Sequence, residues 1–139
     1  MKVCLIVSQI FAYGKVGGFG SLSRLLGRGL LEAGVEVSAV VPLRKHQKPV
    51  EDLDGITVHG YPVRSLLFSG GLFRTIGADV YHSQEPSIAT YIAMRAMPAR
   101  KHIVTCQDPR TRHDWNVFRK YWTHSKRLTF PLSSVHLLC

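Results

Sequence analysis

KVCLIVS, at residues 2–8, is an unbroken apolar run with a polar residue at each end. Such a run is typical of a strand that is buried on both faces of a parallel sheet. After a glycine-containing loop, leucines recur at helical spacing over residues 19–33 and stop at Gly34, a residue that suits a helix C-cap. The sequence therefore opens with a central strand, a loop and an amphipathic helix.

The same alternation of short apolar runs and helical segments continues to about residue 106, and this is the pattern of βαβ units. We expect residues 44–55 to form a polar loop. Residues 65–76 are expected to form a weak helix broken by Gly70 and Gly71, with loop as the alternative over part of this segment. The other expected elements are strands at 35–41, 56–63, 78–83 and 101–106, and a helix at 87–97 capped by Ser87. The predicted fold class is α/β, a Rossmann-like doubly wound and mostly parallel sheet of about five to six strands with helices on both faces.

The C-terminal part is less regular. Residues 114–122 have a helical pattern, whereas residues 128–139 contain strand-like residues around a central proline. This last segment is either a sixth strand cut short or out-of-frame sequence left by a truncated gene. We expect one domain over residues 1–127 and a tail over 128–139.

The composition is globular and strongly basic, with 18 Lys and Arg against 9 Asp and Glu. The excess is greatest between Arg95 and Arg127, which favours anionic partners such as nucleotide diphosphates or lipid headgroups, with nucleic acid the less favoured partner; a solvated face with no partner is also open. Three dispersed cysteines and the absence of a long apolar run predict a cytoplasmic protein with reduced thiols, with peripheral association with a membrane as a further option.

The loop before the first helix contains Gly17 and Gly18, at the place where doubly wound folds bind phosphates. The loop matches neither the dinucleotide-binding nor the P-loop fingerprint, and Arg44 follows the second strand where a dehydrogenase would have an acidic residue. A dinucleotide dehydrogenase is therefore disfavoured. The glycines could also serve only a tight turn.

Three stretches carry a resemblance: LEAGVEV at residues 31–37, ADVYHSQEP at 78–86 and IVTCQDPR at 103–110. Together they resemble the N-terminal domain of family 4-like glycosyltransferases, which have two Rossmann-like domains. The chain departs from the family pattern at Val35, Gln84 and Gln107, where that pattern has histidine.

The resemblance implies a domain that holds the acceptor, which is a glycan, lipid or polysaccharide, facing a second domain that holds the nucleotide-sugar donor. It implies no cofactor. The donor-binding pair of glutamates, seven residues apart, does not occur after Arg110. We therefore expect a chain truncated before the donor domain and inactive alone unless another chain supplies that half. By analogy, the substrate-binding residues are Gly17, Gly18, Phe19, His82, Glu85 and Arg110, and the catalytic residues are Gln107 and Asp108.

Several alternatives stay open. Gln107 could only orient a sugar, because a glutamine cannot take up a proton near neutral pH, and Asp108 could simply form a local ion pair with Arg110. Cys106 could be a nucleophile but has the context of a buried strand residue. A metal site is disfavoured, because the histidines lack ligand spacing and no Cys-x-x-Cys motif occurs. Aromatic residues in 114–122 suit a core-facing helix better than base stacking. A different class of function, a non-catalytic anion- or membrane-binding domain or a gene remnant, is the alternative to the transferase.

Overall fold

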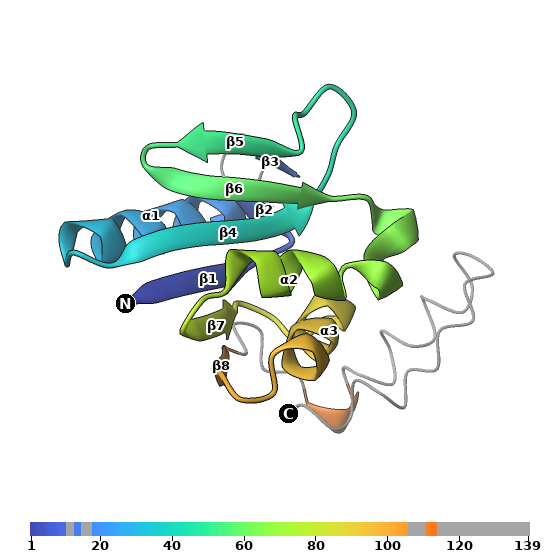
Figure 1. Cartoon of the computed structure of the whole chain (residues 1–139). Helices are drawn as coiled ribbons and strands as arrows, with labels where there is room; N and C mark the ends of the chain where they lie inside the picture. Colours follow the sequence, from blue (N-terminus) through green and yellow to red (C-terminus); the bar gives the residue numbers. More distant parts are fainter. Residues whose placement is uncertain (11–12, 15–17, 106–110, 114–139) are drawn as a thin grey trace. The chain divides into compact units, whose positions relative to one another are not determined.

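Six strands form one sheet in the computed structural model, which describes residues 1–10, 13–14, 18–105 and 111–113 (Figure 1). All six belong to the structural unit Met1–Thr105. All neighbouring strands are parallel except the β5–β6 pair. The predicted α/β class is thus confirmed. In spatial order the strands are β5 (Val50–Leu53), β6 (Ile56–Tyr61), β4 (Glu36–Pro42), β1 (Lys2–Ile6), β7 (Val80–Ser83) and β8 (Lys101–Val104).

Helices cover both faces of the sheet, as predicted (Figure 1). The long helix α1 (Gly18–Glu32) packs leucines onto one face, over β1, β4 and β6. The other face carries η1 (Val63–Phe68), α2 (Gly70–Ile76) and α3 (Ile88–Ala96). Since β1 has a helix layer on each side, its unbroken apolar run is explained by burial on both faces.

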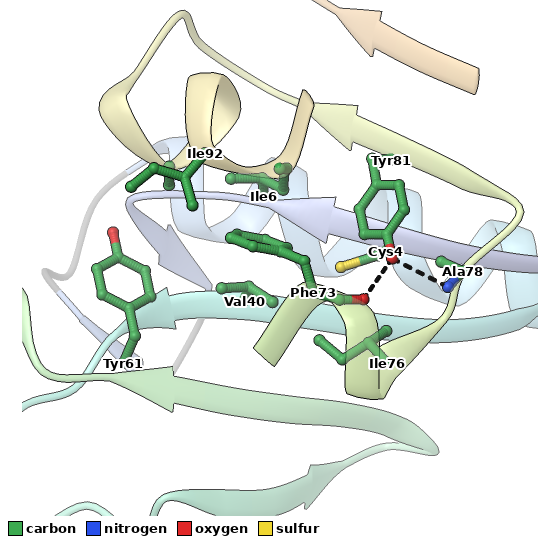
Figure 2. Close-up of a cluster of buried hydrophobic side chains, with 11 residues drawn as sticks. Cys4, Ile6, Val40, Tyr61, Phe73, Ile76, Ala78, Tyr81 and Ile92 are labelled. Atoms are coloured by element: carbon green, nitrogen blue, oxygen red, sulfur yellow. Dashed lines mark hydrogen bonds between the residues drawn. The ribbon is translucent and has the colours of Figure 1, made fainter. Parts of the chain in front are cut away.

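Tyr81 of β7 organises the core beneath α2 and α3 (Figure 2). Its side chain is fully buried and its ring meets that of Phe73 edge to face, with the ring centres 6.0 Å apart. The hydroxyl donates to the Phe73 carbonyl oxygen at 2.6 Å and accepts from the Ala78 N–H at 3.2 Å. These bonds tie the end of α2 to the following strand.

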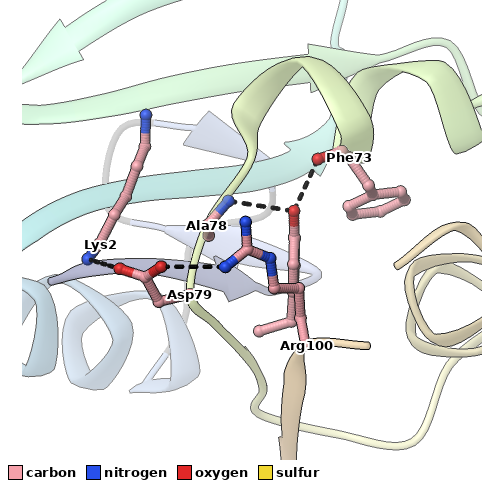
Figure 3. A network of polar contacts seen from close by, with 6 residues as sticks. Lys2, Phe73, Ala78, Asp79 and Arg100 are labelled. Carbon is pink, nitrogen blue, oxygen red and sulfur yellow. Dashed lines mark hydrogen bonds and ion pairs between the residues drawn. The ribbon is translucent and has the colours of Figure 1, made fainter. Parts of the chain in front are cut away.

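The amino ends of three parallel strands are joined by Asp79 (Figure 3). One carboxylate oxygen accepts from the backbone N–H of Lys2 at 2.8 Å, and the other pairs with the Arg100 guanidinium at 3.2 Å. Both partners are partly exposed, so we assign this network to strand alignment rather than to a large share of the stability.

One sequence prediction was wrong and another was right only in part. Residues 44–55 are not all loop, because β5 lies within them and pairs antiparallel with β6. Asp54 and Gly55, with φ of 55° and 86°, form the two-residue turn of this hairpin. The segment 65–76 is divided as predicted, but the break falls at Ser69 rather than at the glycines, since η1 ends at Phe68 and α2 begins at Gly70.

The predicted cap of α3 is confirmed: the Ser87 hydroxyl oxygen accepts from the Thr90 N–H at 3.2 Å. The helix expected at 114–122 and the segment 128–139 lie outside the described residues. In the part of the chain that is described, no helix has the length and apolar character needed to cross a bilayer.

Candidate functional site

The order of the strands places a switch point between β1 and β7. From β1 the chain passes through α1 to β4 on one side, whereas β7, on the other side of β1, leads through α3 to β8. In open α/β sheets, ligands bind outside the carboxyl ends of the strands at this point. The residues that follow the two strands there include Gln9 on β2 (Gln9–Ile10), which pairs with β3 (Tyr13–Gly14), and Gln84 with Glu85. The Gln84 N–H donates to the Ile6 carbonyl oxygen, so the two strand ends are in register.

The first turn of α1 also lies at this edge. The helix begins at Gly18, and Phe19 is 52% exposed. A Cβ atom added to Gly18 would meet no atom within 4 Å, and Gly18 is not among the glycines with positive φ. Within the described residues, therefore, neither packing nor backbone conformation requires a glycine at this position. An open helix N-terminus presents N–H groups that can donate to a ligand oxygen.

A buried polar contact joins α1 to the end of β7. The Ser23 hydroxyl lies 3.1 Å from Oε1 of Gln84 and 2.8 Å from the Phe19 carbonyl oxygen. Both Ser23 and Gln84 are buried. In the sequence, Gln84 is marked only as a departure from a histidine, and Ser23 belongs to no motif. The one available signal was a serine among the regularly spaced leucines of the helix.

His82 lies in β7, one residue before the carboxyl end of that strand. Its Nε2 is 2.8 Å from the Thr105 hydroxyl, a bond that links β7 to the end of β8. Burial lowers the pKa of His82 below its ordinary value, so the ring is neutral at neutral pH. His82 therefore lies near the carboxyl edge of the sheet, with its Nε2 already hydrogen-bonded to Thr105.

Glu85 is exposed and follows Gln84 directly. Burial and, to a smaller extent, the nearby charge of Glu85 raise the pKa of Tyr61 to about 12. Glu85 consequently lies on the Tyr61 side of the edge, while Gln84 turns to α1. An exposed carboxylate offers only acceptor oxygens, which suit ligand hydroxyl groups.

Gln9 has an unpaired buried oxygen. Its Oε1 has no hydrogen-bond partner, the sole buried side-chain polar atom of this kind within residues 1–10, 13–14, 18–105 and 111–113. Leaving such a group unsatisfied costs about 1–3 kcal/mol, so a donor supplied by a ligand would be stabilising. The strand that carries Gln9 packs against α1. Gln9 was not predicted as a site residue, because a lone glutamine before a glycine-rich loop belongs to no motif.

The other residues predicted for the site, Gly17, Gln107, Asp108 and Arg110, lie outside the described residues. Cys106 does too. Among the residues that are described, no three His, Cys, Asp or Glu side chains gather in a way that could hold a metal ion.

Comparison with protein-family models, curated proteins and solved structures finds no match for this chain. The fold therefore rests on the structure, and a function has to be argued from the chemistry of this edge together with the three sequence stretches.

Proposed function

We propose that the unit formed by residues 1–105 is the acceptor-side domain of a nucleotide-sugar glycosyltransferase, and that it binds the acceptor at the carboxyl edge of β1 and β7. The observation that carries the proposal is that three groups follow β1 or β7 at the switch point: the Gln9 oxygen, which has no hydrogen-bond partner, the exposed Glu85 carboxylate, and the start of α1 at Gly18, where an added Cβ atom would meet no atom within 4 Å. The resemblance of residues 78–86 to a family 4-like motif supports it, since that stretch forms one wall of the same edge.

These groups suit a polyhydroxylated ligand. A sugar hydroxyl can donate to the exposed Glu85 carboxylate and accept from a helix N–H at Gly18, and a ligand donor that reached the buried Gln9 oxygen on binding would supply its missing partner. Neutral His82 is half-buried and hydrogen-bonded to Thr105, and this bond holds β7 and the residues that follow it against the end of β8. Under this proposal, the donor nucleotide is held mainly by a second domain, on whichever chain that domain lies.

The test is calorimetric titration of the 139-residue chain with a panel of neutral glycosides and with uridine, guanosine and adenosine diphosphate sugars. We expect a glycoside to bind more tightly than any nucleotide sugar, and a radiolabelled transfer assay to show no turnover. Glu85→Gln should weaken glycoside binding by about tenfold or more, because it removes a charged acceptor. Glu32→Gln is the matched control, since Glu32 is an exposed carboxylate at the other end of α1.

The same substitution at two glycines of α1, Gly18 and Gly29, gives a second test. Gly18→Val should abolish glycoside binding and leave the melting temperature nearly unchanged, because the added side chain enters open space beside the ligand. Gly29→Val adds the same side chain to open space elsewhere on α1 and should leave binding intact. Equal effects of the two substitutions on binding, or micromolar donor binding with turnover, would contradict the proposed role.

A further inference from the structure

The face opposite α1 exposes large apolar side chains. On η1, Val63 is 62% exposed, Leu67 64% and Phe68 86%. The neighbouring helix α3, which contacts η1, exposes Ile88 and Tyr91. Single exposed apolar residues are ordinary, but several on two adjoining elements mark an interaction surface.

The same face is basic. The charged residues of η1, α2 and α3 are Arg64, Arg74 and Arg95, all exposed, and the three helices contain no Asp or Glu. The layer on the other side of the sheet is mixed, because α1 contains Glu32 and its Arg24 pairs with Asp54. The partner of the η1–α2–α3 face should therefore offer negative charge and an apolar interior together.

We propose that the η1–α2–α3 face docks on an anionic phospholipid bilayer. Phe68 and Leu67 enter the boundary between headgroups and acyl chains, and the arginines pair with lipid phosphates. A bilayer supplies negative charge for the arginines and an apolar layer for the exposed apolar side chains. The inference does not depend on the proposed transferase role.

Charge disfavours the two nearest competitors for this face. A second copy of the chain carries the same arginines and a net charge of +9, so two copies repel. Residues 106–139 of the chain are also basic, with six Lys and Arg against two Asp.

The experiment is co-sedimentation of the full chain with phosphatidylcholine vesicles, with and without phosphatidylglycerol. Because each arginine near an anionic surface contributes about a fivefold gain in partitioning, the three together predict about a hundredfold preference for the anionic vesicles. Added salt should release the protein. The triple variant Arg64→Gln, Arg74→Gln, Arg95→Gln should lose the preference, and Phe68→Ser should lower binding about tenfold.

Matched controls lie on α1. Leu25 is 67% exposed, close to the 64% of Leu67, so Leu25→Ser and Leu67→Ser remove equal exposed side chains from opposite layers. Only Leu67→Ser should weaken vesicle binding, and Arg28→Gln should behave like wild type. Circular dichroism melts should show all these variants folded, because each substituted residue is exposed.

Three results would overturn the proposal. The first is equal retention on neutral and anionic vesicles, or equal effects of Leu25→Ser and Leu67→Ser. The second is a concentration-dependent dimer that Phe68→Ser abolishes, which would give the face to a second copy. The third is loss of vesicle binding in Arg119→Gln, Lys120→Gln while the face variants bind normally, which would give binding to the C-terminal basic segment.

Discussion

Replacing Tyr81 by Phe removes one oxygen atom from the core and leaves the ring in place. In the folded protein that oxygen serves two backbone groups, the Phe73 carbonyl at 2.6 Å and the Ala78 N–H at 3.2 Å (Figure 2). The site is fully buried, with Ala78 and Tyr81 both 0% exposed, so water cannot replace the lost partner without opening the core.

The two losses differ in size. The Phe73 carbonyl oxygen keeps a second donor, the Gly77 N–H at 3.1 Å. Losing its hydrogen bond from Tyr81 therefore costs about 0.5–1.5 kcal/mol. The Ala78 N–H is left without a partner and costs about 1–3 kcal/mol. We expect Tyr81→Phe to lower the free energy of unfolding by about 1.5–4.5 kcal/mol, a large share of the stability of a domain this size.

Urea unfolding followed by circular dichroism measures this loss, with an unchanged m-value as the sign that the folded state stays compact. Tyr91→Phe is the control, because Tyr91 is 53% exposed and should change the stability by less than about 0.5 kcal/mol. If Tyr81→Phe costs no more than Tyr91→Phe, the hydroxyl bridge between α2 and β7 does not stabilise the fold as reasoned.

Three further predictions concern Cys4, His82 and Gly60. Burial raises the pKa of the Cys4 thiol from 9.0 to about 12, so above pH 9 the unfolded chain has lost a proton that the folded chain keeps; stability should fall by about 1.4 kcal/mol per pH unit, and Cys4→Ala should flatten that slope in urea titrations. Burial lowers the pKa of His82, so below about pH 6.5 the unfolded chain binds more protons than the folded chain, and stability should decrease as the pH decreases. His82→Gln should reduce this loss of stability at acid pH. A pH profile of stability that is the same for the variant and the wild type would contradict this reasoning. A Cβ atom on Gly60 would lie 2.5 Å from Cδ1 and 3.2 Å from Cβ of Leu43, so Gly60→Ala should cost about 1–3 kcal/mol in thermal unfolding. Adding Leu43→Ala should recover part of that loss, and strictly additive losses would argue against the clash.

Local patterns predicted most of the elements. The run at residues 2–8 indicated a strand buried on both faces, and β1 is that strand, because helices pack on either side of it. Ser87 was predicted as a cap because the bond it accepts comes from a residue only three positions away. Both signals depend on near neighbours in the chain, so no tertiary information was needed.

The hairpin of β5 was missed for the opposite reason. Its polar composition suggested a loop, although Asp54 and Gly55 are a typical two-residue turn. Pairing with β6 makes a strand of residues 50–53, and β6 in turn belongs to the sheet through β4. Strand character here comes from a partner strand rather than from apolar residues of its own.

The candidate site divides in the same way. The family resemblance pointed to His82 and Glu85 without the structure, and Gly18 was also indicated by its loop, because loops after parallel strands lie at one edge of a doubly wound sheet. The contact of Ser23 with Gln84 spans 61 residues, and no spacing rule relates two such positions. The unpaired oxygen of Gln9 is likewise a property of its surroundings, visible only once α1 covers that strand. Periodicity and capping are local and could be read along the chain, whereas the polar partners at the edge depend on how distant segments pack.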